Sequence, residues 1–134
     1  MISEFDDSLH DLIRRRWTIY MCGRRAEPDA IAAVDARATW ADVVVFRGHD
    51  DAAAYRTCLR PGDNPLCPAR IVWHYVSDAE LTLWAVLNIQ TDAVATVPYP
   101  VPDSCRIPEI RRRPLTILPG RPGRLDSPPQ QRRR

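Results

Sequence analysis

Two histidines and two cysteines in the middle of the chain have the side chains that zinc accepts. His49, Cys58, Cys67 and His74 could supply imidazole and thiolate ligands to a tetrahedral ion. However, eight residues separate the two cysteines, which is not the spacing of a zinc knuckle. We therefore expect no metal and no cofactor. We expect all four cysteines of the chain to be free thiols that pack as small buried hydrophobic residues.

His74 could instead act in catalysis, as the base that activates a cysteine. No third group that would orient such a pair can be identified, and the sequence has no nucleophile-elbow motif. Alternation along the predicted strand places His74 between two valines, on the face opposite to Ile71, Trp73 and Tyr75. We expect His74 to be a buried structural residue, and we assign no catalytic residue.

Two helices are expected near the N-terminus. Ser8 is a good N-cap, and Gly23 would end a first helix. Between them the apolar residues recur at helical spacing: Leu9, Leu12, Ile13, Trp17 and Tyr20. A second, alanine-rich helix is predicted to begin at Pro28 and to turn Ile31 and Val34 inward.

The middle of the chain is typical of an antiparallel sheet. The runs "ADVVVFRG" and "AAAYRTCL" predict a β-hairpin, and a third strand begins at Arg70 after a proline-rich loop. Residues 77–80, "SDAE", fit either a capping box that opens a helix or a turn before a fourth strand. Leu81 and Leu83 alternate with polar residues, which favours the strand. Residues 93–97 are the candidate fifth strand.

These elements predict an α+β fold, with two N-terminal helices packed on an antiparallel β-meander of four to five strands. Residues 1–97 would form the compact domain. Residues 98–105 would be a stiff connector, because proline occurs at every second position from 98 to 102. Residues 106–134 are rich in proline and arginine and poor in apolar residues, and are expected to be a disordered basic tail.

Charge is divided between these parts. Residues 1–105 hold ten arginines and fifteen acidic residues, whereas residues 106–134 hold nine arginines and two acidic residues. All nineteen basic residues are arginine, which is typical of GC-rich codon usage and excludes lysine chemistry. A mobile basic tail attracts phosphate backbones without reading bases. The residues expected to contact nucleic acid are Arg111, Arg112, Arg113, Arg121, Arg124, Arg132, Arg133 and Arg134.

The favoured function is that of a small non-enzymatic accessory protein. Its acidic body would bind a protein partner, and its tail would add weak, nonspecific contact with nucleic acid. We expect a cytoplasmic protein with no membrane insertion, because no stretch approaches eighteen consecutive apolar residues and the N-terminal segment is acidic. One alternative is a purely structural or interaction protein whose tail only improves its solubility.

The other alternative is an enzyme. The stretch "RIVWHYVSDAELTLWAVLNI" is similar to the last hairpin of RelE/ParE-type toxins, which are small ribosome-dependent or gyrase-directed proteins on an α+β frame. The resemblance covers about twenty residues and implies a sheet surface that presents basic or aromatic side chains to a phosphate. A ribonuclease-like or thiol-dependent enzyme of this kind would use Arg47, His49, Tyr55, Arg56 or His74 on the sheet.

Overall fold

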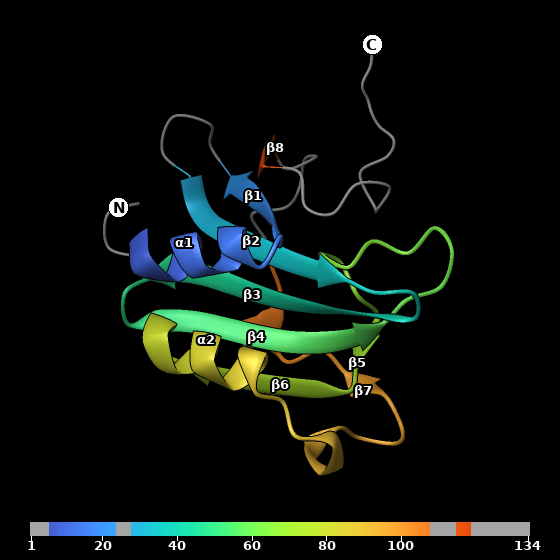
Figure 1. Cartoon of the computed structure of the whole chain (residues 1–134). Helices are drawn as coiled ribbons and strands as arrows, with labels where there is room; N and C mark the ends of the chain where they lie inside the picture. Colours follow the sequence, from blue (N-terminus) through green and yellow to red (C-terminus); the bar gives the residue numbers. More distant parts are fainter. Residues whose placement is uncertain (1–5, 24–27, 108–114, 119–134) are drawn as a thin grey trace.

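The computed structural model describes residues 6–23, 28–107 and 115–118, and in these ranges the chain forms an antiparallel sheet with two helices on one face (Figure 1). The elements in chain order are α1 (Asp6–Arg14), β1 (Thr18–Gly23), β2 (Pro28–Ala36), β3 (Trp40–Gly48), β4 (Asp51–Cys58), β5 (Arg70–Ile71), β6 (Trp73–Ser77), α2 (Ala79–Leu87), η2 (Thr91–Ala93), β7 (Tyr99–Pro100), η3 (Asp103–Cys105) and β8 (Leu115–Leu118). The predicted α+β class and antiparallel sheet are confirmed.

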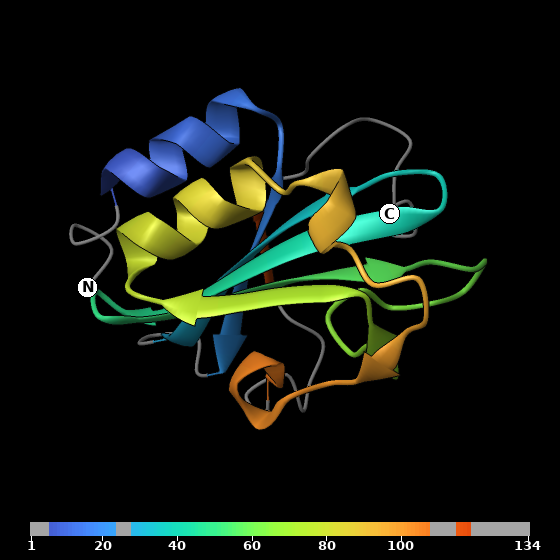
Figure 2. The ribbon, with the colours of Figure 1, turned by 90° about the horizontal axis from the view of Figure 1, so that it is seen from below.

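The main sheet has the strand order β6-β4-β3-β2-β1-β8, with every neighbouring pair antiparallel. Strands β1 to β4 form a meander, and β6 joins its outer edge beside β4. A separate pair is formed by β5 and β7. Figure 2 shows both helices on one face of the sheet and the segment with β7 and η3 on the other.

Both faces of the sheet are therefore covered, and there are two cores. On the helix side, Leu12 and Leu83 pack with Phe46 of β3. On the other side, Val45 of the same strand packs with Val101 and Cys105. Strand β3 is apolar on both faces because it lies in the middle of the sheet, as its sequence predicted.

The second predicted helix is wrong, because the residues from Pro28 form strand β2. Ile31 faces the helix-side core and Val34 the other core, so the strand has no polar face that would reveal its alternation. Its alanine content favours a helix in isolation. Pairing with β3, in which Ile31 lies opposite Phe46, overrides that propensity.

The first predicted helix is confirmed only in its first part. Helix α1 already includes Ser8, which therefore is not its N-cap, and it ends at Arg14, nine residues before Gly23. Residues Thr18–Gly23, predicted to complete the helix, form strand β1. Two hydrogen bonds close the helix, from the Trp17 amide to the Leu12 carbonyl and from the Arg16 amide to the Ile13 carbonyl, both at 3.0 Å. This is a Schellman motif in which Arg16, at φ 67°, takes the left-handed position that glycine usually fills. No glycine therefore marks the end of this helix in the sequence.

The choice of a fourth strand after residues 77–80 is also wrong, because Ala79–Leu87 is helix α2. Asp78 is the N-cap, and its carboxylate accepts a hydrogen bond from the Leu81 amide at 2.8 Å. Residues 93–97 form no strand either. Ala93 ends the short helix η2, and the Ala95 amide donates to the Val72 carbonyl at 2.7 Å.

The segment predicted as a connector packs on the sheet. Val101 and Cys105 are buried, and so is Ile107, the second residue of the predicted tail. The Arg47 guanidinium donates to the carbonyl oxygens of Ser104 and of Arg106, the first residue of that tail. Residues 115–118, which the tail prediction left without regular structure, form β8 beside β1. The remaining predicted tail, residues 108–114 and 119–134, lies outside the described residues. No helix in the described ranges is long and apolar enough to cross a bilayer.

Candidate functional site

His74 is exposed, so the prediction of a buried histidine is wrong. It lies on the edge strand β6, and its Nδ1 atom is 2.8 Å from the Tyr99 hydroxyl. As predicted, Trp73 lies on the opposite face, where its ring stacks on Tyr75 with 6.5 Å between centroids. Ile71 instead belongs to the core on the side away from the helices, because the strand is interrupted between β5 and β6.

The side chains considered for an enzyme are not assembled into an exposed site. Arg47, Tyr55 and His74 lie on the face away from the helices, with Tyr55 opposite His74, but only His74 of this pair is exposed. Tyr55 is fully buried, its hydroxyl donates to the Pro65 carbonyl at 2.6 Å, and burial raises the pKa of this phenol well above its ordinary value. Arg56, the next residue along β4, lies on the opposite face of the sheet, which the helices cover. Arg47 is bonded to the segment around η3. Because β6 is followed by a helix, the hairpin that carried the resemblance to RelE/ParE-type toxins is also absent from this part of the structure.

The cysteines and histidines proposed as zinc ligands are likewise not assembled. Among the described residues, no group of three or more His, Cys, Asp or Glu side chains could hold a metal ion. All four cysteines are free thiols, as expected. Cys22 and Cys105 are buried, but Cys58 and Cys67 are exposed, which corrects the prediction that every cysteine packs in a core.

The arginines predicted to contact nucleic acid lie outside the described residues. Arg111, Arg112 and Arg113 precede β8, and the other five follow it: Arg121, Arg124, Arg132, Arg133 and Arg134. Their role stays a prediction.

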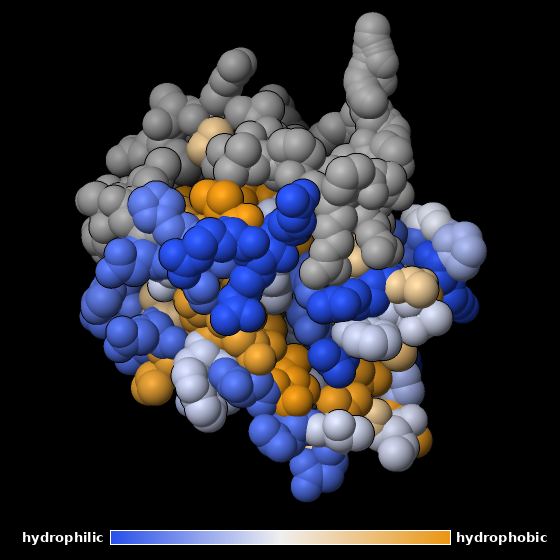
Figure 3. Space-filling model, in the orientation of Figure 1, coloured by the Kyte–Doolittle hydropathy of each residue, from blue (hydrophilic) through white to orange (hydrophobic). Residues whose placement is uncertain are grey.

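The first candidate surface that the structure reveals is at the edge of the sheet, where β6 pairs with β4 on one side and with no described strand of the main sheet on the other. Tyr75 and Val76, on the two faces of this strand, are 37% and 47% exposed. On the adjoining helix α2, Leu81 and Trp84 are 50% and 66% exposed. We call these four residues the edge surface. In Figure 3, hydrophobic side chains are visible among hydrophilic ones over α2 and β6.

The edge surface was missed from the sequence, although the signal was present. Helix α2 is apolar on every side, which is usual for a fully buried helix. Here one side packs on the sheet through Leu83 and Val86, and the other side meets no described residue that covers it. In the sequence, the absence of a polar stripe favoured a strand. In the structure, the same absence marks a helix with a second apolar side.

The surroundings of the edge surface are acidic. Residues 71–105 contain four acidic residues and no arginine. At the N-terminal end of α2, Asp78 and Glu80 lie beside the turn between β3 and β4, because the Ala79 amide donates to the His49 carbonyl at 2.9 Å. That turn adds Asp50, and Asp51 follows it as the first residue of β4. The nearest charges to this end of the edge surface are therefore negative.

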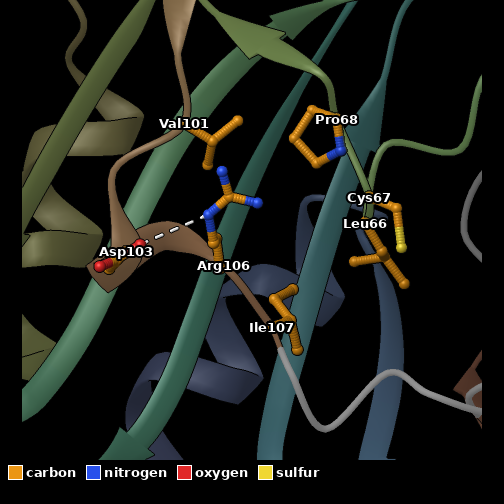
Figure 4. A pocket seen from close by; sticks show the side chains of 7 residues that line it. All are labelled: Leu66, Cys67, Pro68, Val101, Asp103, Arg106 and Ile107. Carbon is orange, nitrogen blue, oxygen red and sulfur yellow. Dashed lines mark ion pairs between the residues drawn. The ribbon is translucent and has the colours of Figure 1, made fainter.

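A hollow of about 540 Å³ lies on the face away from the helices, between the loop after β4 and the segment with η3 (Figure 4). Leu66, Pro68 and Val101 form apolar walls, and the Arg106 guanidinium extends between them. Arg106 pairs with Asp103 at 3.5 Å between Nε and Oδ1. Ile107, the last described residue before the gap to β8, also lines it.

A polar pocket of about 440 Å³ lies on the helix-bearing face, near the C-terminal ends of both helices. Across the sheet, Asp35 of β2 is opposite Asp42 of β3, which is opposite Arg56 of β4. Asp42 accepts two hydrogen bonds from Arg56, at 2.7 and 3.0 Å, and Asp35 pairs with Arg37. Burial raises the pKa of Asp42, against the lowering effect of Arg56, and the nearby Asp35 carboxylate raises it further.

Comparison with known proteins gives no family model, no curated protein and no solved structure that matches this chain.

Proposed function

We propose that the protein is a non-enzymatic accessory protein that binds a partner protein through the edge surface, by accepting a strand of the partner beside β6. The observation that carries the proposal is an uncharged edge strand that pairs with no described strand on its outer side, next to a helix with a second apolar side. The segment with η2 meets this edge just before β6 begins, where the Ala95 amide donates to the Val72 carbonyl. Natural sheets usually protect such an edge with charges, proline or a covering element. Strand β6, "WHYVS", contains no acidic residue, no arginine or lysine and no proline.

The exposed side chains are suited to a protein interface. Tyrosine and tryptophan are enriched among the residues that contribute most to binding free energy, and here Tyr75 and Trp84 are exposed. A partner strand would satisfy the outward amide and carbonyl groups of β6 through main-chain hydrogen bonds. Its side chains would meet Val76 on one face and Tyr75 on the other.

The charge around the edge surface favours one kind of partner, an extended apolar segment with basic residues beside it. Asp78, Glu80 and the aspartates at the β3–β4 turn surround one end of β6, and the region from residue 71 to 105 has no arginine. An acidic partner would bring like charges together, whereas a basic one is attracted and oriented.

The predicted role of the tail is retained as the second part of the proposal. The nine arginines of residues 106–134 would contact phosphate groups weakly and without sequence preference, while the body holds the partner. The accessory protein would thus bring a partner protein close to nucleic acid.

The proposal is tested with a synthetic probe peptide of alternating valine and threonine with two lysines at each end, labelled for fluorescence anisotropy. Wild-type protein is expected to bind it saturably. Val76→Lys should weaken binding roughly 30-fold, which corresponds to the loss of about 2 kcal/mol expected for a residue at the centre of an interface. Val97→Lys is the matched control, since Val97 is 73% exposed but lies outside β6 and α2.

Equal affinity of the two variants would contradict the proposal. Two further outcomes would replace the proposed partner. A concentration-dependent dimer that Val76→Lys abolishes would mean that the edge surface binds a second copy of the chain. Tighter peptide binding after removal of residues 119–134 would mean that the chain's own arginine-rich segment competes for this surface.

A further inference from the structure

We infer that the polar pocket near the C-terminal ends of α1 and α2 binds an oxyanion, the phosphate or carboxylate group of a small ligand. Three arginines from different segments line it: Arg15 follows α1, Arg37 follows β2 and Arg56 lies in β4. Arginine is the side chain best suited to the planar, bidentate recognition of such groups.

Two of the guanidinium groups are held in place before any ligand arrives. Arg56 donates from Nε and Nη2 to the carboxylate of Asp42, and it lies 4.9 Å from the centroid of the Trp40 ring. Arg37 has Nε at 3.1 Å and Nη2 at 3.0 Å from Oδ2 of Asp35. A ligand would therefore meet donors whose side-chain entropy is already lost.

These ion pairs leave donors available. The Nη1 groups of Arg56 and Arg37 bond to no described residue, because each carboxylate is met by the Nε and Nη2 side of its guanidinium. Arg15 reaches Asp11 only through Nε, at 3.3 Å, so both of its Nη groups are available among the described residues. Each of the three arginines is paired with an aspartate, yet each guanidinium keeps at least one N–H group that no described residue accepts, and these groups can donate to an anion.

The wall of the pocket suggests what the rest of the ligand is like. The lining is mainly polar, and Leu87 and Ile89 add a small apolar surface beside the charged row, with Trp17 largely buried behind it. An oxyanion that carries a small apolar group would place its charge on the arginines and its apolar part against these residues. The pocket is at the C-terminal end of α2, whereas the acidic residues near the edge surface are at its N-terminal end, so the two sites can be tested separately.

The test is a titration of the full chain with sodium phosphate and, in a second arm, with sodium acetate, each at constant ionic strength. Two-dimensional NMR follows the arginine Nε–H signals and the indole N–H signal of Trp17. We expect saturable shifts of Arg37, Arg56 and Trp17. Arg37→Gln should raise the dissociation constant at least about tenfold, because a hydrogen bond to a charged group contributes about 1.5 kcal/mol or more.

Arg14→Gln is the matched control. Arg14 also pairs with Asp11, at 3.0 Å, but it does not line the pocket, so its substitution should leave the dissociation constant unchanged. Saturation at lower concentration in the phosphate arm identifies a phosphoryl ligand, and the reverse identifies a carboxylate. Linear shifts in both arms, or equal weakening by Arg14→Gln and Arg37→Gln, would overturn the inference. The NMR spectrum of each variant also shows directly whether it is folded.

Discussion

The ion pair between Arg56 and Asp42 allows a direct test of how the helix-bearing face is stabilised. The Asp42 side chain is 10% exposed and that of Arg56 is 22% exposed. Replacing Arg56 by methionine keeps most of the side-chain volume but leaves the buried carboxylate with no partner in the pair. Breaking a buried pair in this way costs about 3–5 kcal/mol, and the partial exposure of Arg56 places our expectation near the lower limit, about 3 kcal/mol.

The cost should depend on pH in a defined direction. Burial already raises the pKa of Asp42 above its ordinary value, so the folded state binds the proton more tightly than the unfolded state. The contribution of this group to stability is therefore greatest at low pH and is lost as the pH rises through the raised pKa. Arg56→Met removes the largest effect that lowers this pKa, so the pKa should rise further. The destabilisation should then be smaller at about pH 4.5 than at about pH 7.

Urea denaturation at both pH values measures these differences as changes in the free energy of unfolding. The double variant Asp42→Leu/Arg56→Met should recover most of the stability, because it removes the unpaired charge along with its partner. A loss below about 1 kcal/mol in Arg56→Met at neutral pH would refute the reasoning. A double variant no more stable than the single one would refute it as well, since the carboxylate would then not be the cause.

Three other outcomes follow from the described contacts. Tyr55→Phe should lower the free energy of unfolding by about 1–3 kcal/mol in urea denaturation, because it leaves the buried Pro65 carbonyl without its donor. Deleting residues 119–134 should leave the thermal midpoint unchanged in calorimetry, whereas deleting residues 106–134 should lower it, because the second deletion also removes buried Ile107 and strand β8. For nucleic acid, replacing Arg111, Arg112 and Arg113 by alanine should weaken binding to every sequence alike. It should also reduce the slope of log affinity against log salt by up to about three contacts, each worth about 0.9; an unchanged slope in anisotropy titrations would contradict a role of these arginines.

The hairpin of β3 and β4 could be predicted because its residues carry local signals. β-branched residues around Val44 and the polar turn at Asp50 identify two strands and their connection without any knowledge of distant contacts. The N-terminal helix was found for the same reason, since Leu9 and Leu12 repeat at helical spacing.

Two of the errors share one physical cause, which is an element with apolar residues on two sides. Strand β2 lies between two cores and helix α2 has two apolar sides, so neither shows the polar face that distinguishes a strand period from a helical one. The sequence also did not reveal which segments cover the sheet. Val101 and Ile107 are isolated apolar residues between prolines, and only the folded sheet shows that they complete a core.

The candidate sites depend on tertiary structure even more strongly. Asp35, Asp42 and Arg56 are far apart in sequence and become neighbours only through the register of three strands. The edge surface likewise requires knowing that β6 is the last strand of the sheet. The residues selected from sequence for their chemistry, such as Tyr55 and His74, lie in different surroundings, one buried and one exposed.

Residue-resolved hydrogen exchange of the β6 amides, with and without saturating probe peptide, tests most directly whether the edge surface accepts a strand. A strand added beside β6 would bond the outward amides at alternate positions of Trp73–Ser77, while the inward amides already pair with β4. We predict that the peptide slows exchange at these outward amides at least about tenfold and leaves the amides of β1 unchanged. Binding that leaves every β6 amide unaffected would contradict the proposed mode of partner recognition.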